Sequence, residues 1–412
     1  MKSKKTKLDP VDFFQKLTKE KNICFYLSNS ENGFEKIIAF NPVAKISTKK
    51  DADIKAFTIE NAKRSRKVLG YISYDYGFKT QNIKSKAKND LKLPNTYLLA
   101  FENWISFDKK SETLHFKDPK FPEKIKEIQK RIPQKTKTPI SKNFKPELSK
   151  SEYNKAYKQI KHHIKEGDIY QINLTHRLKA ETNINSKELF VKTIEANDVD
   201  FLAYIEGEDF DVLSASPERF IRIKDKKAET CPVKGTRPRG KTQKQDEALK
   251  KELIESEKEA AELNMITDLL RNDLGKVSKI GSVKVEGHRL ISKCPTVWHT
   301  YSRITSEIHP KLSNIEALIS MLPGGSITGC PKKRAMQIID KLEPISRGIY
   351  TGTILQINPN QDIDSSIAIR TIIKKDKNLY LQVGGGIVLD SENQPEYEET
   401  LHKAASFMKI LE

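Results

Sequence analysis

The sequence predicts an α+β protein in which antiparallel sheets are covered by helices. Short apolar runs bounded by turn-forming residues recur along the chain and indicate strands. Other segments carry apolar residues every three or four positions, which is typical of helices with one buried face. The links between successive strands are mostly short, and short links favour antiparallel over parallel neighbours.

The chain is long enough to bury a large core. Its 412 residues correspond to two or three average domains, or to one large α/β body. No segment approaches the roughly 20 apolar residues that span a bilayer, so we expect no membrane insertion. The basic N-terminus is not followed by the apolar stretch of a secretory signal, so we expect a cytoplasmic protein. Cys24, Cys231, Cys294 and Cys330 lack the spacing of a zinc site, and we expect reduced thiols.

The composition is strongly basic. Lys and Arg number 74 against 55 Asp and Glu, a net charge of +19, so a nucleic-acid-binding protein is an alternative from a different functional class. The lysines are scattered over the whole chain, as on a solvated surface. The basic stretch from Lys124 to Lys145 contains only one aromatic residue, Phe144. We therefore expect no nucleic-acid partner.

The sequence changes character near residue 146. Up to this point, short apolar runs indicate strands joined by irregular links, and few motifs carry chemistry. Beyond it, Ser149 and Glu152 form a capping box at the start of a helix that ends near Gly167. We therefore divide the chain into an N-terminal region, 1–146, and a region 147–412 that carries the motifs.

A strand follows this helix at Ile169–Thr175. Ile172 and Leu174 alternate with Gln171 and Asn173, so Gln171 points away from the apolar layer. The remaining pattern predicts, in order, strands at 200–207 and 211–223, a loop at 231–240, a long helix at 246–273, strands at 282–287 and 297–304, a glycine-rich loop at 322–331, a helix to 342, strands at 350–357, 367–373 and 378–389, and a terminal helix.

The long helix places Glu255, Glu259 and Glu262 on one face, at i, i+4 and i+7. Such a row can hold a hard cation. The alternative is a solvated face, because Lys251 and Lys258 each precede one of these glutamates by four residues and can pair with it. The spacing alone favours the solvated face.

The terminal helix carries Glu396, Glu399 and Lys403 at i, i+3 and i+7, away from its apolar face. Mg²⁺ takes one or two carboxylates and keeps waters or substrate oxygens at its other positions. One glutamate from each helix would therefore suffice if the two helices converge. The spacing does not show whether they do.

Lys234 lies in the segment PVKGT, between a proline-stiffened entry and Gly235, where backbone can approach a ligand closely. Most loop lysines are solvated and idle, which is the simpler interpretation. Lys234 can act as a nucleophile only if desolvation or neighbouring cations lower its pKa enough to free the amine at neutral pH.

Two glycine runs lack the spacing of nucleotide-binding loops. The three glycines at 384–386 either form a tight turn or expose backbone N–H groups that suit a carboxylate. Pro331 is predicted at the first position of a helix, with Thr328 or Gly329 at its start, where anions are favoured. The basic residues at 332–334 oppose the helix dipole, a placement that helix stability alone does not explain.

Nine motifs occur in one order along residues 150–410: GDIYQINLTHR, SASPERF, PVKGTRPRG, ELNMITDLLRNDLG, LPGGSITGCPKKRAMQIIDKLEP, RGIYTG, AIRT, GGGIVLDS and EYEETLHKA. This set resembles the chorismate-utilising enzymes, which comprise anthranilate synthase component I, aminodeoxychorismate synthase component I, and the isochorismate and salicylate synthases. The resemblance implies two large stacked antiparallel sheets flanked by helices, with the active site between them. Residues 1–146 would contribute to this sandwich, and 147–412 would form the chorismate-binding catalytic region.

In this family one glutamate from each acidic helix binds Mg²⁺, and the matching residues are Glu262 and Glu399. The resemblance gives Glu259 and Glu396 supporting positions. Mg²⁺ there acts as a Lewis acid and template that bridges to the ring carboxylate of chorismate.

The family pattern also provides a site for the second carboxylate of chorismate. A guanidinium suits this task better than an ammonium, because it can make two parallel hydrogen bonds. The residues at the matching positions are Tyr350, Arg370, Gly384, Gly385 and Gly386, with Lys403 close by.

Two positions distinguish the reactions of the family. Isochorismate and salicylate synthases carry a water-activating lysine where this chain has Gln171, so the glutamine indicates an ammonia user. Anthranilate synthases carry alanine where this chain has Lys234, whereas aminodeoxychorismate synthases carry lysine. The resemblance therefore implies formation of 4-amino-4-deoxychorismate from chorismate and ammonia, on the route to p-aminobenzoate and folate. Anthranilate formation is the alternative.

By the same resemblance, Lys234 attacks C2 of chorismate with loss of the C4 hydroxyl, and ammonia then attacks C4 and expels the lysine. Glu218 of the SPE motif is the expected general acid and later base, against the alternative of a surface strand residue. Thr236, His299 and Thr328 match positions that line the ring, although a lone histidine is more often structural.

None of the four cysteines lies in the nucleophile elbow of a glutamine amidotransferase, so we expect a separate glutaminase subunit to supply the ammonia. The chain departs from the family pattern at two places. Cys330 replaces the usual alanine before Pro331, and an N-terminal LLES-type motif linked with tryptophan binding is missing.

Overall fold

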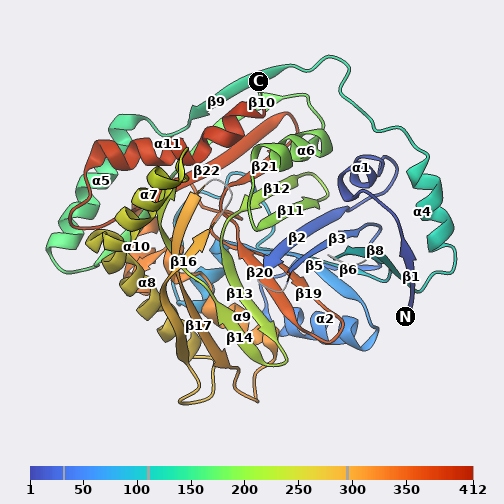
Figure 1. Cartoon of the computed structure of the whole chain (residues 1–412), viewed down its shortest axis with the longest axis horizontal. Coiled ribbons are helices and arrows are strands. Elements are labelled where there is room, and N and C mark those ends of the chain that lie inside the picture. The colour runs from blue at the N-terminus through green and yellow to red at the C-terminus, as the bar shows by residue number, and fades with distance from the viewer. Residues whose placement is uncertain (31–32, 109–111, 294–296, 412) are drawn as a thin grey trace.

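The computed structural model describes residues 1–30, 33–108, 112–293 and 297–411 (Figure 1). These residues form two antiparallel sheets, one of 12 strands and one of 10, flanked by helices. The predicted α+β class with two large antiparallel sheets is therefore confirmed. No helix of the described segments is long and apolar enough to cross a membrane. Cys294 lies outside the described residues.

The larger sheet begins at the N-terminal strand and ends at a short strand of the glycine-rich loop 322–331. Its strands, in spatial order, are β1 (Lys2–Thr6), β8 (Glu112–Phe116), β7 (Trp104–Phe107), β3 (Gly33–Ala39), β2 (Cys24–Ser30), β11 (Phe201–Glu206), β12 (Asp211–Ser216), β21 (Thr371–Lys375), β22 (Asn378–Ile387), β10 (Gln171–Thr182) and β18 (Gly329–Cys330), with β9 (Ser141–Pro146) also paired to β10.

The smaller sheet has the strand of Lys234 at one edge. Its strands, in spatial order, are β15 (Val233–Pro238), β17 (Val297–Glu307), β14 (Lys227–Thr230), β13 (Arg219–Lys224), β20 (Ile363–Ile367), β19 (Thr353–Ile357), β5 (Lys67–Ile72), β6 (Thr96–Phe101) and β4 (Ala44–Ile46), with β16 (Lys284–Lys293) also paired to β17.

The helices cover the outer faces and one end of the sheets, and α5, α7, α8 and α11 gather on the left in Figure 1. The helix α5 begins at the predicted capping box of Ser149 and Glu152. The helices are α1 (Pro10–Gln15), α2 (Asp51–Lys63), α3 (Gly77–Thr80), α4 (Phe121–Gln129), α5 (Lys150–Lys165), α6 (Ser186–Ala196), α7 (Gln243–Glu255), α8 (Glu257–Gly275), α9 (Asn314–Met321), α10 (Lys332–Leu342) and α11 (Asn393–Lys409), with short 3₁₀ turns η1 (Tyr74–Tyr76) and η2 (Gly325–Ile327).

Alternation of side chains along the strands separates the core into layers. In β2, Tyr26 joins a buried cluster that also contains Leu69 and Tyr71 of β5, so this cluster lies between the two sheets. Phe25 and Leu27 belong to a second cluster, with buried residues of α1 and α6. Successive residues of a strand point to opposite faces, so β2 serves the core between the sheets and the core under the helices.

Both sheets draw strands from before and after Pro146. The N-terminal region supplies β1, β2, β3, β7, β8 and β9 to the larger sheet and β4, β5 and β6 to the smaller one. The division of the chain at residue 146 into regions of different role stays a prediction.

The helix expected at 246–273 is two helices, α7 and α8, which meet at Ser256. The backbone of Ser256 is extended, and its side chain accepts a hydrogen bond from the backbone N–H of Glu259 at 3.4 Å. Ser256 is therefore the N-cap of α8. Serine is favoured at this position more than in the interior of a helix, so the helical pattern breaks here. As a consequence, Glu255 lies on a different helix from Glu259 and Glu262, and its carboxylate is 3.7 Å from Lys251, the solvated pairing that the spacing suggested.

Candidate active site

Two of the expected site residues lie where the chain passes from one sheet to the other. Glu218 stands between β12 of the larger sheet and β13 of the smaller sheet. Arg370 stands between β20 of the smaller sheet and β21 of the larger sheet. The single strand expected at 367–373 is therefore wrong: this segment contains the end of one strand, a crossover and the start of another.

Lys234 lies on the edge strand β15, whereas a loop was expected at 231–240. The pairing of β15 with β17 shifts register at Gly235, whose φ of +70° is a conformation that favours glycine. A Cβ atom at Gly235 would lie 2.8 Å from Leu253 Cδ1 and 3.2 Å from Glu259 Oε2, so the bulge also packs closely against α7 and α8. Beside this bulge, Lys234 Nζ is 3.8 Å from Glu262 Oε2, and about a fifth of each side chain is exposed, 21% and 22%.

Lys403 of α11 connects the glycine run to the acidic residues of its own helix. Its Nζ donates a hydrogen bond to the carbonyl of Gly384 at 3.0 Å and lies 2.6 Å from Glu399 Oε1. Gly385 leaves room for the neighbouring carboxylate, because a Cβ there would lie 3.2 Å from Glu396 Oε2. Lys403 thus holds the glycine strand and the carboxylates of α11 together.

The electrostatics of Glu396 and Glu399 differ. Burial raises the pKa of Glu396, and the charge of Glu399 raises it further. Burial acts in the same direction on Glu399, but Lys403, with the charges of Lys234 and Lys258, outweighs it and lowers the pKa of Glu399. At neutral pH, Glu399 is therefore the better of the two as an anionic ligand.

Lys234 interacts with a carboxylate of each acidic helix. This lysine pairs with Glu262 of α8, and its charge also lowers the pKa of Glu399 of α11. Lys258 of α8 acts on both Glu396 and Glu399. Glu262 and Glu399 are therefore both near enough to Lys234 to interact with its charge, which spacing along the sequence could not show.

Glu259 has a different partner from Glu262. Its Oε1 lies 3.4 Å from Nη1 of Arg237, which comes from the same strand as Lys234. Across the described residues, no group of three or more His, Cys, Asp and Glu side chains has the arrangement of a protein-only metal site. Any cation held by these glutamates would therefore draw most of its ligands from water or a bound molecule.

Glu218 is half-buried and accepts a hydrogen bond at Oε1 from Ser326 Oγ, at 2.9 Å. Burial raises the pKa of this carboxyl, and the Ser326 hydroxyl and the charges of Lys234 and Lys403 only partly offset the rise. The sequence did not single out Ser326. The sequence feature that could have identified Ser326 is its hydroxyl side chain inside the glycine-rich loop 322–331.

Gln171 lies at the start of β10 with its side chain 3% exposed. A Cβ on Gly386 would lie 2.7 Å from Gln171 Nε2, so a side chain at 386 would push this amide out of its present position. The Oε1 atom of Gln171 is buried and has no hydrogen-bond donor among the described residues. A buried acceptor without a donor can accept a hydrogen bond from a bound molecule.

The glycine run is part of a strand and does not form a turn. Gly384, Gly385 and Gly386 pair with Thr175, Leu174 and Asn173 of β10. On the other edge of β22, pairing with β21 ends at Leu381. This edge is therefore not paired to a strand along the three glycines, which leaves backbone N–H groups to face the space beside β21, as a carboxylate site requires.

His299 on β17 contacts the neighbouring strand β15. Its Nδ1 lies 3.2 Å from the carbonyl of Gly235 and 2.9 Å from Thr236 Oγ1. A carbonyl can only accept, so Nδ1 carries the proton and Nε2 keeps its lone pair. Burial lowers the pKa of His299, and the charge of Arg370 lowers it further, so the ring is neutral at neutral pH.

Arg370 is half-buried and has a positive φ of 49°. Burial lowers the pKa of its guanidinium. In the part of the chain that the structure describes, this guanidinium has neither an ion pair nor a hydrogen bond. A half-buried cation without a counter-charge is suited to bind an anion.

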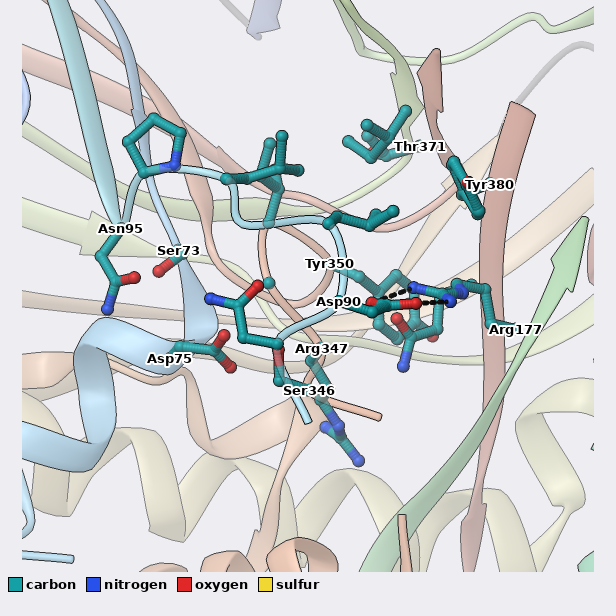
Figure 2. Close-up of a pocket in the computed structure, with 18 residues that line it drawn as sticks. Ser73, Asp75, Asp90, Asn95, Arg177, Ser346, Arg347, Tyr350, Thr371 and Tyr380 are labelled. Carbon is teal, nitrogen blue, oxygen red and sulfur yellow. Dashed lines mark hydrogen bonds and ion pairs between the residues drawn. The ribbon is translucent and has the colours of Figure 1, made fainter. Parts of the chain in front are cut away.

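Tyr350 is 7% exposed, and its hydroxyl is hydrogen-bonded to the side chain of Asn173. A pocket lies beside Tyr350, with Arg347 and the Arg177–Asp90 ion pair in its wall (Figure 2). None of the glutamates or lysines expected at the site lines this pocket.

Thr328 is fully buried, and its hydroxyl donates to the carbonyl of Gly324 at 2.9 Å, inside its own loop. Pro331 caps α10 and is not its first residue. Two of the three basic residues that follow are explained by ion pairs with other parts of the chain. Lys332 Nζ lies 2.6 Å from the buried Asp273, and Arg334 lies 2.8 Å from Asp168.

The chain is similar to known proteins over nearly all of its length. Residues 22–409 match the chorismate binding enzyme family. Aminodeoxychorismate synthase component 1 of Bacillus subtilis (strain 168) is 36% identical over 84% of this chain and 76% of its own. Anthranilate synthase component 1 of Acetivibrio thermocellus is 32% identical over 98% of this chain and 92% of its own.

A solved structure agrees with these similarities. Anthranilate synthase component I from Streptococcus pneumoniae TIGR4 has a TM-score of 0.81 and 28% sequence identity to this chain, covering 91% of this chain and 92% of that one. Its similarity extends over both sheets. The chain therefore belongs to the chorismate binding enzyme family and is a chorismate-utilising enzyme of the anthranilate or aminodeoxychorismate synthase component I type.

Proposed function

We propose that this chain aminates chorismate at C4, as component I of an aminodeoxychorismate synthase on the route to p-aminobenzoate and folate. The observation that carries the proposal is the position of Lys234. It lies on an edge strand, 3.8 Å from the carboxylate of Glu262, and its charge acts on the half-buried Glu218. A nucleophile and a proton donor so placed can act on two atoms of one ring.

Chorismate carries two carboxylates, and the site offers two places for them. Arg370 has a guanidinium without a counter-charge among the described residues, and the family pattern places it close to the edge of Gly384–Gly386 and to Tyr350. The other place is the space between α8 and α11, where Glu262 and Glu399 would hold Mg²⁺ and Glu259 and Glu396 would support them. When bound, Mg²⁺ would supply Lewis acidity and neutralise a substrate carboxylate.

The carboxylates between α8 and α11 fit a Mg²⁺ ion in kind and number. They offer only oxygen donors, and two of them are sufficient because Mg²⁺ retains waters or substrate oxygens. Glu262 and Glu399 are each paired with an ammonium, at 3.8 and 2.6 Å, so this space already accommodates positive charge.

The reaction proceeds in two displacements. In the first, the Lys234 amine forms a bond to C2, the C4–O bond breaks, and Glu218 gives a proton to the departing hydroxyl, which leaves as water. In the second, ammonia bonds to C4, Lys234 leaves C2, and Glu218 takes a proton from the new ammonium. The raised pKa of Glu218 keeps it protonated for the first displacement.

The nitrogen is supplied as ammonia, and a glutaminase subunit is the proposed source. Gln171 supports ammonia as the nucleophile, because its buried Oε1 lacks a donor and an amide cannot deprotonate water as a lysine amine can. The names of the relatives, component 1 of two-component synthases, fit the same assignment.

Anthranilate synthesis is the second candidate. The anthranilate synthase relative covers 98% of this chain, more than the aminodeoxychorismate synthase relative does. This reaction does not need a lysine nucleophile, so the two candidates make opposite demands on Lys234.

Mass spectrometry of the products distinguishes the two candidates. The chain is incubated with chorismate, Mg²⁺ and ammonium at alkaline pH, beside Lys234→Ala and the control Lys251→Ala, which changes an exposed lysine of α7. We expect aminodeoxychorismate from the wild type and the control, and a loss of roughly 100-fold or more in Lys234→Ala. Anthranilate from both the wild type and Lys234→Ala would contradict the proposal and favour the second candidate.

A further inference from the structure

The carboxyl group of Glu218 has two different oxygen environments. Oε1 accepts the hydroxyl of Ser326 at 2.9 Å. Within the described residues, no second hydrogen bond reaches this carboxyl group. The two charges that act on it come from different elements, Lys234 from β15 and Lys403 from α11, and both are cations.

The loop that carries Ser326 is held in place on several sides. The carbonyl of Ile327 accepts hydrogen bonds from Asn173 Nδ2 at 3.2 Å and from Arg347 Nη1 at 3.0 Å. Gly325 rests on α8, since a Cβ there would lie 2.6 Å from Leu269. The Ser326 hydroxyl is therefore presented to Glu218 by a loop that has little freedom to move.

The backbone of Glu218 is fixed as well. Its N–H donates to Ser216 Oγ at 3.3 Å, and its carbonyl accepts from the N–H of Ile367 at 3.0 Å. With the backbone fixed at one end and Oε1 at the other, the rotation of the carboxyl group is determined. The direction of Oε2 is determined with it.

We infer that Ser326 is a positioning residue for the general acid: its hydroxyl occupies Oε1 of Glu218 and leaves Oε2 as the oxygen that carries the transferable proton. The inference rests on the proposed function and adds to it the atom from which the proton moves. In the first displacement the C4–O electron pair leaves with the oxygen, which takes the proton of Oε2 and departs as water. The carboxylate that remains keeps its hydrogen bond from Ser326.

This arrangement predicts how Glu218 responds when the hydroxyl is removed. A hydrogen bond to a carboxylate stabilises the charged form and lowers the pKa. Ser326→Ala therefore raises the pKa of Glu218 and frees the carboxyl group to rotate. Ser326→Thr keeps a hydroxyl at the same position and should restore the wild-type behaviour.

The first measurement is a ¹³C NMR titration of the chain labelled at glutamate carboxyls, with the signal of Glu218 assigned from Glu218→Gln. We expect the pKa of Glu218 to rise in Ser326→Ala and to return in Ser326→Thr. The control is Ser320→Ala. Ser320 is an exposed serine of α9 whose hydroxyl donates a hydrogen bond to the backbone carbonyl of Glu316. An unchanged pKa in Ser326→Ala would overturn the inference, and this readout does not depend on any turnover of chorismate.

The second measurement follows the rate at which chorismate adds to Lys234 in the absence of ammonia, by intact-protein mass spectrometry. We expect Ser326→Ala to lower this rate about tenfold, a fraction of the effect of a whole general acid, with little change in KM for chorismate. In a Glu218→Gln background, Ser326→Ala should cause no further loss, and an equal further loss would contradict the inference. If no variant forms an adduct but the NMR shift is present, the lysine mechanism fails while the positioning of Glu218 by Ser326 stands.

Discussion

Glu218 and Arg370 lie on two neighbouring crossovers whose backbones are hydrogen-bonded to each other. The N–H of Ile367 donates to the Glu218 carbonyl, and the N–H of Ala215 donates to the Arg370 carbonyl, each at 3.0 Å. The expected proton donor and the expected carboxylate-binding cation are thus fixed relative to each other by main chain. Side-chain substitutions at either position should leave this frame in place, which makes them informative.

Arg370→Ala should weaken chorismate binding. A hydrogen bond to a charged group contributes about 1.5–3 kcal/mol, so we expect KM for chorismate to rise roughly 10- to 100-fold, with a smaller effect on kcat. Steady-state kinetics at saturating ammonia measures this. Because Arg370 has a positive φ, Arg370→Gly serves as the control that removes the guanidinium without backbone strain. An unchanged KM in both variants would exclude Arg370 from substrate binding.

Arg347→Ala should destabilise the fold strongly. Arg347 and Glu343 form a bidentate pair at 2.7 and 2.8 Å, with side chains 1% and 4% exposed. Removal of the arginine leaves a buried carboxylate without its partner, a cost of about 3–5 kcal/mol. Chemical denaturation gives this number.

Arg64→Ala is the matched control for Arg347, because Arg64 pairs with Glu60 at the same i,i+4 spacing but on the surface. An exposed pair of this kind contributes less than about 1 kcal/mol. A similar decrease in the free energy of unfolding in both variants would show that burial does not make the Arg347–Glu343 pair more important than a surface pair.

Mg²⁺ should stabilise the protein against heat, because a ligand that binds only the folded state raises the unfolding temperature. We expect Glu262→Gln and Glu399→Gln each to weaken Mg²⁺ binding by about tenfold or more, since each removes one anionic ligand. Thermal unfolding over a series of Mg²⁺ concentrations measures this. Glu255→Gln, on the neighbouring helix α7, should leave the Mg²⁺ dependence unchanged; equal effects in all three variants would argue against a specific site.

His176 should make the stability of the protein fall in mild acid. The ring is 3% exposed, and burial lowers its pKa from 6.5 to about 4. The unfolded chain therefore binds more protons than the folded one between these two values. Stability contributed by the neutral ring is fully present above pH 6.5 and is lost as the pH falls to about 4, a change of about 3 kcal/mol.

Urea unfolding between pH 7 and pH 4 tests the effect of His176. His176→Gln should show a shallower decline of the unfolding free energy than the wild type. Tyr153→Phe, which changes a ring packed against His176 but keeps the histidine, should decline as the wild type does. A decline of equal slope in His176→Gln would show that other groups cause the acid sensitivity.

The sequence by itself determined many of the elements of this protein and its family. The capping box at Ser149, the paired strands and the terminal helix follow from local periodicity and capping, which depend on residues a few positions apart. The same is true of the residue types available for chemistry. Lys234, Glu218 and the two acidic rows could be named because a motif preserves their type and order.

Only the tertiary structure decided which of these residues meet. Ser326 reaches Glu218 across 108 residues of sequence, and Lys234 of a strand edge pairs with Glu262 of α8 while its charge acts on Glu399 of α11. Segment 367–373 kept its apolar pattern through a crossover, so it resembled a single strand, and Ser256 ended one helix and began another within one helical pattern. Local patterns encode which face of an element is buried, whereas long-range packing selects the neighbour against which it is buried.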